Sequence, residues 1–156
     1  MKKLTVGSVF AAVTAILALA SLIVYNWNVG APGYYQHAKV SNLALFCILA
    51  IVGMVVAIVL ANLRLQGPGD TVVSLIVGAI QIVVPALLAL CLINLIAARA
   101  EGLGFIYFSN ADVIVEVQTP ENLSSATGAI TNMVCLGVST VVGIVTAFLN
   151  IKKKAA

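Results

Sequence analysis

The chain contains few charged residues. Of its 156 residues only eight are Lys or Arg and five are Asp or Glu, while 62% are hydrophobic. A chain of this size has room for one domain. Its fraction of charged residues is below the range of soluble globular proteins. A small globule cannot bury this many apolar side chains, so we expect lipid to surround most of the protein. The net charge of +3 lies between and beyond the apolar runs, which favours a lipid bilayer rather than nucleic acid as partner.

Residues that carry chemistry are also scarce. His37 is the single histidine, and Cys47, Cys91 and Cys135 stand far apart with no Cys-x-x-Cys pair. One histidine cannot form a zinc site, and a dithiol oxidoreductase needs vicinal cysteines. No carboxylate pair or nucleophile–base set is visible, so we expect neither an enzyme nor a cofactor. We interpret the cysteines as small apolar side chains, with a thiolate cluster as the alternative.

Long apolar runs are what the chain does have. The third, from Thr71 to Ala98, would reach roughly 40 Å as a helix, more than the ~30 Å hydrocarbon core of a bilayer. The four runs predict an all-α integral membrane protein, a four-helix antiparallel bundle forming a single domain over residues 1–156. The expected helices cover residues 4–25, 43–63, 71–98 and 125–149, with an inner turn at 64–70 and outer loops at 26–42 and 99–124. The first run also allows a secretory signal cleaved after Ala20.

The basic residues predict an orientation. Lys and Arg near membrane spans favour the cytoplasmic side, and here six fall on one side and two on the other. We therefore expect a multi-pass protein of the cell membrane with cytoplasmic N- and C-termini, and the short loops are typical of a bacterial protein. The six are Lys2, Lys3, Arg64, Lys152, Lys153 and Lys154, and the two are Lys39 and Arg99.

The segment 99–124 predicts a small β-hairpin outside the membrane. Residues 105–108 and 113–117 are rich in aromatic and β-branched side chains, and the stretch 109–112 between them has the composition of a turn. Two strands alone are marginally stable, so this hairpin needs a surface to rest on. We expect it to be an interaction element with contacts through Phe105, Tyr107, Phe108 and Val115.

Small residues at helical spacing predict how the spans pack. In lipid, such residues let helix backbones approach closely, and amide side chains bond between helices. For Gln81, near Pro85, an alternative hypothesis is that it lines a small polar cavity. The residues expected to form helix-packing or partner contacts are Gly53, Ala57, Gly78, Gln81, Asn132, Ser139 and Gly143.

The layout of four spans with inward termini is similar to that of the claudins in topology alone. Claudins carry a large first outer loop with a Trp-Gly-Leu-Trp stretch and a cysteine pair, whereas loop 26–42 is short and has Trp27 without these neighbours. We do not assign the chain to that family. We expect an accessory or scaffolding subunit that contacts a membrane-protein partner or a second copy of itself. The alternative is a small transport or channel component that forms an oligomer around Gln81 and Asn132.

Overall fold

A computed structural model describes residues 5–63 and 68–152, and this part of the chain is helical without any strand. Its elements are α1 (Val6–Gly30), α2 (Leu43–Ala61), α3 (Pro68–Phe108), α4 (Ala111–Val117) and α5 (Pro120–Ala147). Four of them, α1, α2, α3 and α5, are long and apolar enough to cross a membrane. The prediction of a helical protein with four membrane-type helices is therefore confirmed.

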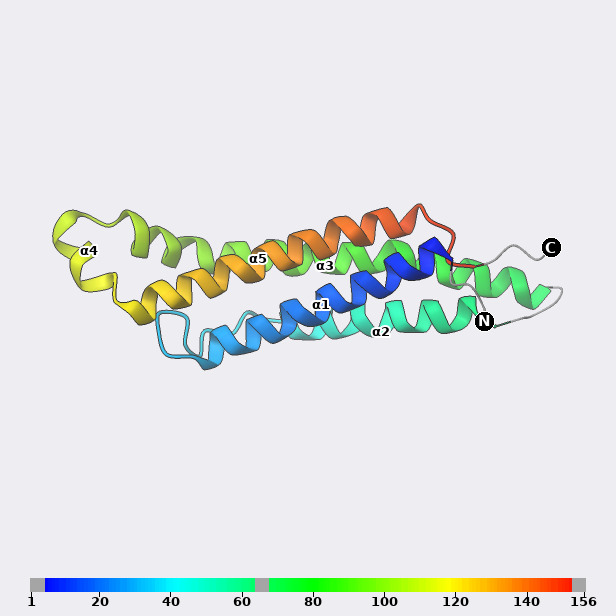
Figure 1. Cartoon of the computed structure of the whole chain (residues 1–156), viewed down its shortest axis with the longest axis horizontal. Helices are drawn as coiled ribbons and strands as arrows, with labels where there is room; N and C mark the ends of the chain where they lie inside the picture. The colour runs from blue at the N-terminus through cyan, green and yellow to red at the C-terminus, as the bar shows by residue number, and fades with distance from the viewer. Residues whose placement is uncertain (1–4, 64–67, 153–156) are drawn as a thin grey trace.

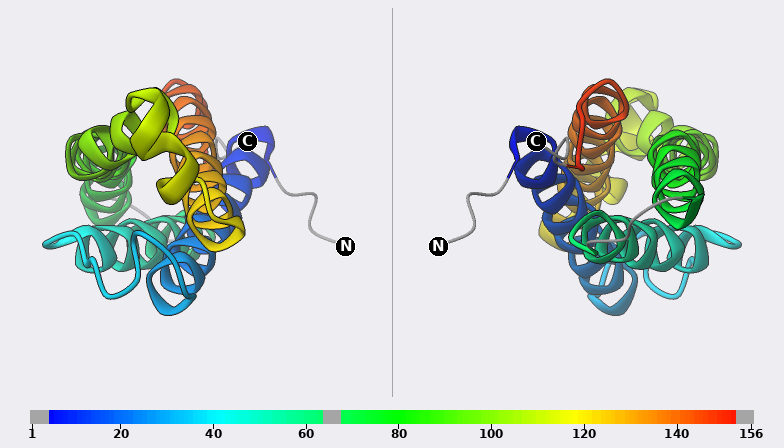
Figure 2. Two further views of the ribbon diagram at one scale, coloured as in Figure 1. Left: turned by 90° about the vertical axis from the view of Figure 1, so that its left-hand side faces the viewer. Right: turned by 90° about the vertical axis from the view of Figure 1, so that its right-hand side faces the viewer.

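The four long helices lie side by side and form a ring in the order α1, α2, α3, α5 (Figures 1 and 2). Hydrogen bonds at both ends fix the relation of α1 to α5. Asn28, late in α1, donates to the carbonyl of Ser125, early in α5 (2.7 Å), and Thr5, before α1, donates to the carbonyl of Ile151, after α5 (2.7 Å). These two helices therefore run in opposite directions along their whole length.

The interface between α1 and α5, here called the seam, has a regular spacing of buried residues. Steps of four and three residues alternate on both helices, which is the heptad pattern of helices that cross at a small angle. Most seam residues are small or carry a hydroxyl or amide, so the two backbones come close. The buried residues at this spacing are Gly7, Ala11, Thr14, Ala18, Ser21, Tyr25 and Asn28 on α1, and Ser125, Ala129, Asn132, Leu136, Ser139, Gly143 and Thr146 on α5. Gly128, outside this spacing, also packs against Asn28.

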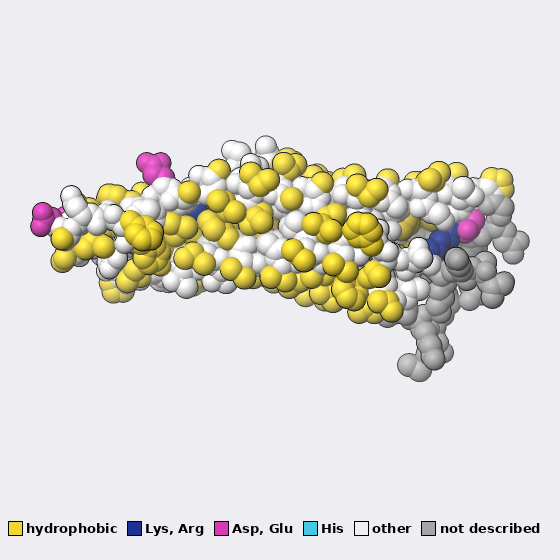
Figure 3. Space-filling view, turned by 90° about the horizontal axis from the view of Figure 1, so that it is seen from above, with side chains coloured by type: hydrophobic (Ala, Val, Ile, Leu, Met, Phe, Trp, Pro, Cys, Tyr) yellow, Lys and Arg dark blue, Asp and Glu magenta, His cyan; other side chains and the backbone are white. Residues whose placement is uncertain are grey.

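The outward faces of the long helices are apolar. Between 28% and 39% of the residues in the most apolar window of each helix are buried, so most of these side chains point outward. Large examples are Ile16, Ile82 and Val141. Figure 3 shows charged side chains toward the ends of the molecule and none along the middle of that face. Such a surface is suited to lipid and indicates a membrane protein.

The β-hairpin prediction is wrong. α3 continues past the predicted end at Ala98 as far as Phe108, and the second predicted strand is helix α4. Buried Arg99, Gly102 and Ile106 continue the three- and four-residue spacing of the α3 core, so packing overrides the β-propensity of this stretch. Asn110, which we took for a turn residue, caps α4 by accepting the N–H of Val113 (3.2 Å).

Other helix boundaries also differ from prediction. α1 continues without a break across Ala20 to Gly30, which shortens the first outer loop to residues 31–42. α5 begins at Pro120 because Thr119 accepts the N–H of Asn122 (3.2 Å) and proline suits the first helical position. Pro68–Asp70 of the predicted inner turn form the first turn of α3. Residues 64–67, and the basic residues Lys2, Lys3, Arg64, Lys153 and Lys154, lie outside the described residues.

Candidate functional site

The end of the bundle away from the start of α1 and the end of α5, called the outer end after the predicted orientation, carries a helical projection (Figures 1 and 2). This projection, here called the apical hairpin, is formed by residues 103–121 at the end of α3, in α4 and at the start of α5. The opposite end is called the inner end. Within it, α4 contacts α3 and buries none of its own residues. Gln118 holds α4 in place by donating from Nε2 to the carbonyl of Ile106 (3.0 Å). Asn122 adds a bond from Nδ2 to the carbonyl of Val117 (2.9 Å). Specific amide bonds therefore hold α4 against the end of α3 and the start of α5.

The four residues predicted to form an outer interaction element all lie on this apical hairpin. Phe108 and Val115 are 86% and 81% exposed, Phe105 is 44% exposed, and Tyr107 is half-buried. Four of the five acidic residues of the chain also lie on or beside the hairpin, and all four are exposed; they are Glu101, Asp112, Glu116 and Glu121. The surface is thus apolar at its most exposed side chains and negatively charged around them.

The outer loop, residues 31–42, folds back onto α3 and α5 through Tyr35. The backbone N–H of Tyr35 donates to Ser125 Oγ (3.1 Å), and its hydroxyl donates to the carbonyl of Arg99 (2.9 Å). Gly33 allows this path, since its φ is +130° and a Cβ there would lie 2.5 Å from the carbonyl oxygen of Glu121. Burial raises the pKa of Tyr35 to about 12, although the charge of Arg99 opposes the rise.

Arg99 is the largest fully buried side chain among the described residues, at 2% exposure. It donates from Nη2 to the carbonyl of Ala38, and its Cζ lies 4.4 Å from the centre of the Tyr35 ring. Its Nε has no hydrogen-bond partner in the described part of the chain, where the one ion pair is between Lys152 and Asp70. Arg99 is therefore a buried cation held by a carbonyl and an aromatic ring rather than by a carboxylate from the described residues.

Gln81 and Asn132, the two predicted polar contacts, both lie inside the bundle. Gln81 donates from Nε2 to the carbonyls of Thr146 (2.6 Å) and Leu149 (3.0 Å), and Asn132 Oδ1 accepts the hydroxyl of Ser21. Both amides thus bond between helices of a single chain. An oligomeric path lined by these two residues would have to break these bonds.

Ser139 and Gly143 lie in the seam. The hydroxyl of Ser139 donates to the carbonyl of Thr14 on α1 (3.3 Å). A Cβ at Gly143 would lie 3.3 Å from Cβ of Pro85 and 3.4 Å from Cγ2 of Thr14, which is tighter than or at the limit of ordinary packing. Close approach of α5 to both α1 and α3 therefore depends on the glycine.

The small residues predicted on α2 and α3 lie in different surroundings. Ala57 is fully buried, and a Cβ at Gly53 would lie 3.0 Å from Cγ2 of Val84. Gly78, in contrast, has open space beside it, with no atom of the described chain within 4 Å of an added Cβ. Of these three, Gly78 is the one that leaves room for a contact outside the bundle.

The cysteines are all free, and two of them touch. Cys47 and Cys91 are fully buried between α2 and α3 with their sulfurs 3.6 Å apart, whereas Cys135 is half-buried on α5. Over residues 5–63 and 68–152, no group of three or more His, Cys, Asp or Glu side chains is placed to hold a metal ion. The three thiols therefore do not form the cluster that was the alternative for them.

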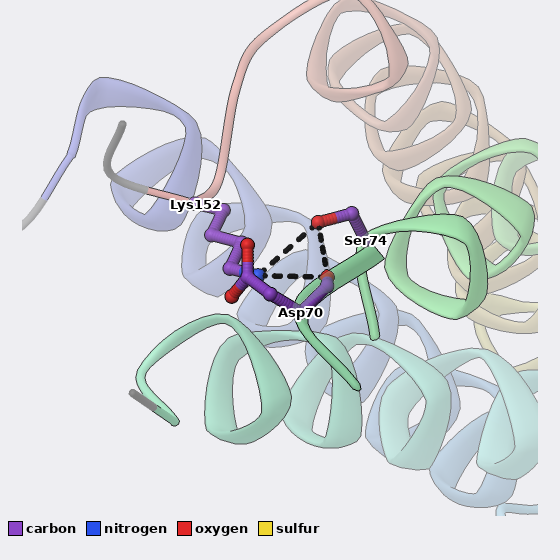
Figure 4. A network of polar contacts seen from close by, with 3 residues as sticks. All are labelled: Asp70, Ser74 and Lys152. Atoms are coloured by element: carbon purple, nitrogen blue, oxygen red, sulfur yellow. Dashed lines mark hydrogen bonds and ion pairs between the residues drawn. The ribbon is translucent and has the colours of Figure 1, made fainter. Parts of the chain in front are cut away.

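The inner end of the bundle has a polar network that the sequence did not reveal (Figure 4). Lys152 donates from Nζ to Asp70 Oδ1, and also to the carbonyl of Asp70 and to Ser74 Oγ (3.1 Å each). The chain after α5 folds back here, so that Ile151 is 3% exposed and its carbonyl accepts the hydroxyl of Ser8 (3.2 Å). The sequence signal that could have indicated this network is an acidic residue in the first turn of one span and a lysine just beyond the last span.

A scan against models of protein families found no match, and searches of curated proteins and of solved structures found no significant similarity to this chain. The comparisons therefore supply no role for these residues.

Proposed function

We propose that the protein is a non-enzymatic, multi-pass accessory subunit of a membrane-protein assembly and that the apical hairpin docks the partner. In this proposal α1, α2, α3 and α5 cross a bacterial cell membrane with both termini in the cytoplasm and the apical hairpin outside. The observation that carries the proposal is that α4 buries none of its residues, while Val115 within it and Phe108 shortly before it are more than 80% exposed.

The lengths of the helices support a position outside the lipid for the apical hairpin. α2 has 19 residues, about 28 Å of helix, and matches the ~30 Å hydrocarbon core of a bilayer. α3 has 41 residues, about 61 Å, or roughly twice that thickness. A bilayer centred on α2 leaves the last turns of α3 and all of α4 in water or in the headgroup layer.

Large apolar side chains exposed in that position would contribute free energy of binding when a partner covers them. Covering a side chain such as Phe or Val contributes about 1.5–3 kcal/mol, and aromatic side chains such as Phe are enriched in protein interfaces. The surrounding carboxylates favour a partner with a basic rim, because complementary charge speeds association and selects orientation. A second copy of the chain carries the same acidic residues and is the less favoured occupant. The transport alternative stays a prediction, which no contact among the described residues favours.

Site-specific photocrosslinking in native membranes tests the proposal. A photoreactive phenylalanine analogue at Phe108 is expected to give one discrete heavier product that contains a second protein. Phe148, just after α5 at the opposite end, is the matched control because it is also 86% exposed. The analogue at Phe148 is expected to give no such product.

Two further results decide between occupants. Val115→Asp is expected to remove the Phe108 product while leaving the helical content unchanged, since Val115 is 81% exposed. Equal yields at Phe108 and Phe148, or no product at either, would contradict partner docking. A product made of two differently tagged copies of this chain would replace the partner protein by a homo-oligomer.

A further inference from the structure

A cavity of about 290 Å³ opens at the outer end of the bundle, where α1 ends and α2 begins. Its polar lining includes Asn26, Lys39 and Asn42, and its apolar lining includes Ala44 and Leu45. No acidic side chain lines it. The volume is at the lower end of the roughly 300–1,000 Å³ typical of ligand sites, so it suits a headgroup or a small anion rather than a large molecule.

One cation lines this cavity without a counter-charge from the described residues. It is Lys39, whose ammonium forms no ion pair within residues 5–63 and 68–152. Arg99 is buried and does not line the cavity, but it bonds the carbonyl of Ala38, the residue directly before Lys39, and adds a second positive charge to this part of the loop. The part of the outer loop beside the cavity is therefore positively charged on balance, and a negative ligand would be stabilised there.

The amide side chains at the cavity have hydrogen-bond donors to spare. Asn42 is in the left-handed region with φ +60°, and its side chain makes no capping bond to α2. Asn26 uses one of its two amide hydrogens on the carbonyl of Leu22 (2.9 Å), which leaves the second for a ligand. Lys39, Asn42 and Asn26 together present the N–H groups that a phosphate oxygen accepts.

We propose that this cavity binds the phosphate of an anionic phospholipid headgroup in the outer leaflet. The position favours lipid over a free anion because the apolar lining at Leu45 continues onto the outward faces of α1 and α2, where Ile23 and Ile48 are exposed. An acyl chain can follow these side chains while the headgroup occupies the cavity. The inference needs the membrane position of the helices but not the docking of a partner at the apical hairpin, so each can fail alone.

Trp27 makes the test direct, because it is the single tryptophan, is 58% exposed and adjoins Asn26. Full-length protein is reconstituted in phosphatidylcholine vesicles that contain either brominated phosphatidylglycerol or brominated phosphatidylcholine, and quenching of Trp27 reports which lipid occupies the site. We expect the anionic lipid to be preferred about fivefold, the effect of one basic residue beside an anionic headgroup. Lys39→Gln should bring the preference close to one.

Control variants separate this site from general attraction of anionic lipid. Lys152→Gln removes the same charge at the opposite end and should leave the preference unchanged. Asn42→Gly removes the amide and keeps a residue suited to the positive φ at this position, and it should lower the preference. Circular dichroism checks folding, which Lys39→Gln should not alter because Lys39 is exposed. Equal quenching by both lipids in the unsubstituted protein overturns the proposal. Loss of the preference on adding millimolar glycerol phosphate also overturns it, since the site would then take free phosphate esters.

Discussion

The two sides of the bundle are held together in different ways. Across the seam, hydroxyl and amide side chains of α1 and α5 bond at several depths, from Asn28 near the outer end to Thr14 near the inner end. Between α2 and α3, the polar contacts among the described residues are those of the Cys91 thiol with Cys47 and with the carbonyl of Leu43. The other buried residues of α2 are apolar.

This difference has a physical consequence in a membrane. Apolar side chains gain little by leaving lipid for another helix, whereas close backbone approach and interhelical hydrogen bonds do favour association. The seam should therefore fix the register of the bundle. α2 should be the long helix that separates most readily from its neighbours.

The largest expected effect is an insertion of volume into the seam. Gly143→Leu places a branched side chain where even a Cβ lies 3.3 Å from Pro85 and 3.4 Å from Thr14. We expect a loss of about 1–3 kcal/mol in the free energy of unfolding, the usual cost of overpacking. Unfolding by SDS in mixed micelles, followed by circular dichroism, measures this loss.

Gly78→Leu is the matched control for Gly143→Leu. The same substitution is made in a long helix, but no described atom lies within 4 Å of the new Cβ. Its effect should stay within about 0.5 kcal/mol, as for substitutions that meet nothing. Equal losses at the two positions would show that helix propensity, rather than packing in the seam, decides the outcome.

The thiols test whether α2 is the loosely held helix. In folded protein, a membrane-permeant maleimide should modify half-buried Cys135 first, and Cys47 and Cys91 at least about tenfold more slowly, since each 1.4 kcal/mol of opening free energy is a factor of ten. Peptide mass spectrometry gives the three rates. Because both protected thiols face the same interface, they should share one rate, faster than that of global unfolding. Separate rates for Cys47 and Cys91 would argue against release of α2 as a unit.

A smaller effect is expected from a single bond of the seam. In a double-mutant cycle of Ser21→Ala and Asn132→Ala, the coupling energy should be about 0.6 kcal/mol and not above about 1.7 kcal/mol, the range found for hydrogen bonds between membrane helices. A cycle of Ser21→Ala with Thr131→Ala should show no coupling because Thr131 is exposed. Coupling in the control cycle equal to that of Ser21 with Asn132 would mean that the bond is not what links α1 to α5.

The four long helices could be predicted from the sequence because the bilayer sets a minimum length for any apolar span, whatever it packs against. The seam was harder to predict. Small residues at helical spacing suggested Ser139 and Gly143, which lie in the seam, but also Gly78 on α3, which has open space beside it. The buried positions of the seam alternate steps of four and three. A choice between these positions requires knowing which helix is the neighbour.

The outer end could not be predicted because its causes are distant in sequence. From the sequence alone, Arg99 is interpreted as a charged residue of a loop. In the structure it is buried in contact with Tyr35 and Ala38 of the outer loop. The helix then continues past Arg99, and a stretch rich in β-branched and aromatic residues becomes helical. At the inner end, Lys152 and Asp70 are 82 residues apart, so no local pattern could pair them.

The effect that is smallest at neutral pH, where it vanishes, concerns the loop that joins the two sides. Burial raises the pKa of Tyr35 to about 12 from an ordinary value near 10, so the folded protein holds this proton where the unfolded chain has lost it. The stability that Tyr35 contributes is therefore complete below pH 10 and is lost as the pH rises from 10 to 12. Absorbance of tyrosinate near 295 nm should show a late-titrating tyrosine that disappears in Tyr35→Phe and remains in Tyr34→Phe, which leaves Tyr35 in place. If Tyr35→Phe lowered the absorbance change near pH 10 and left the late titration in place, the outer loop would not seal Tyr35 against α3.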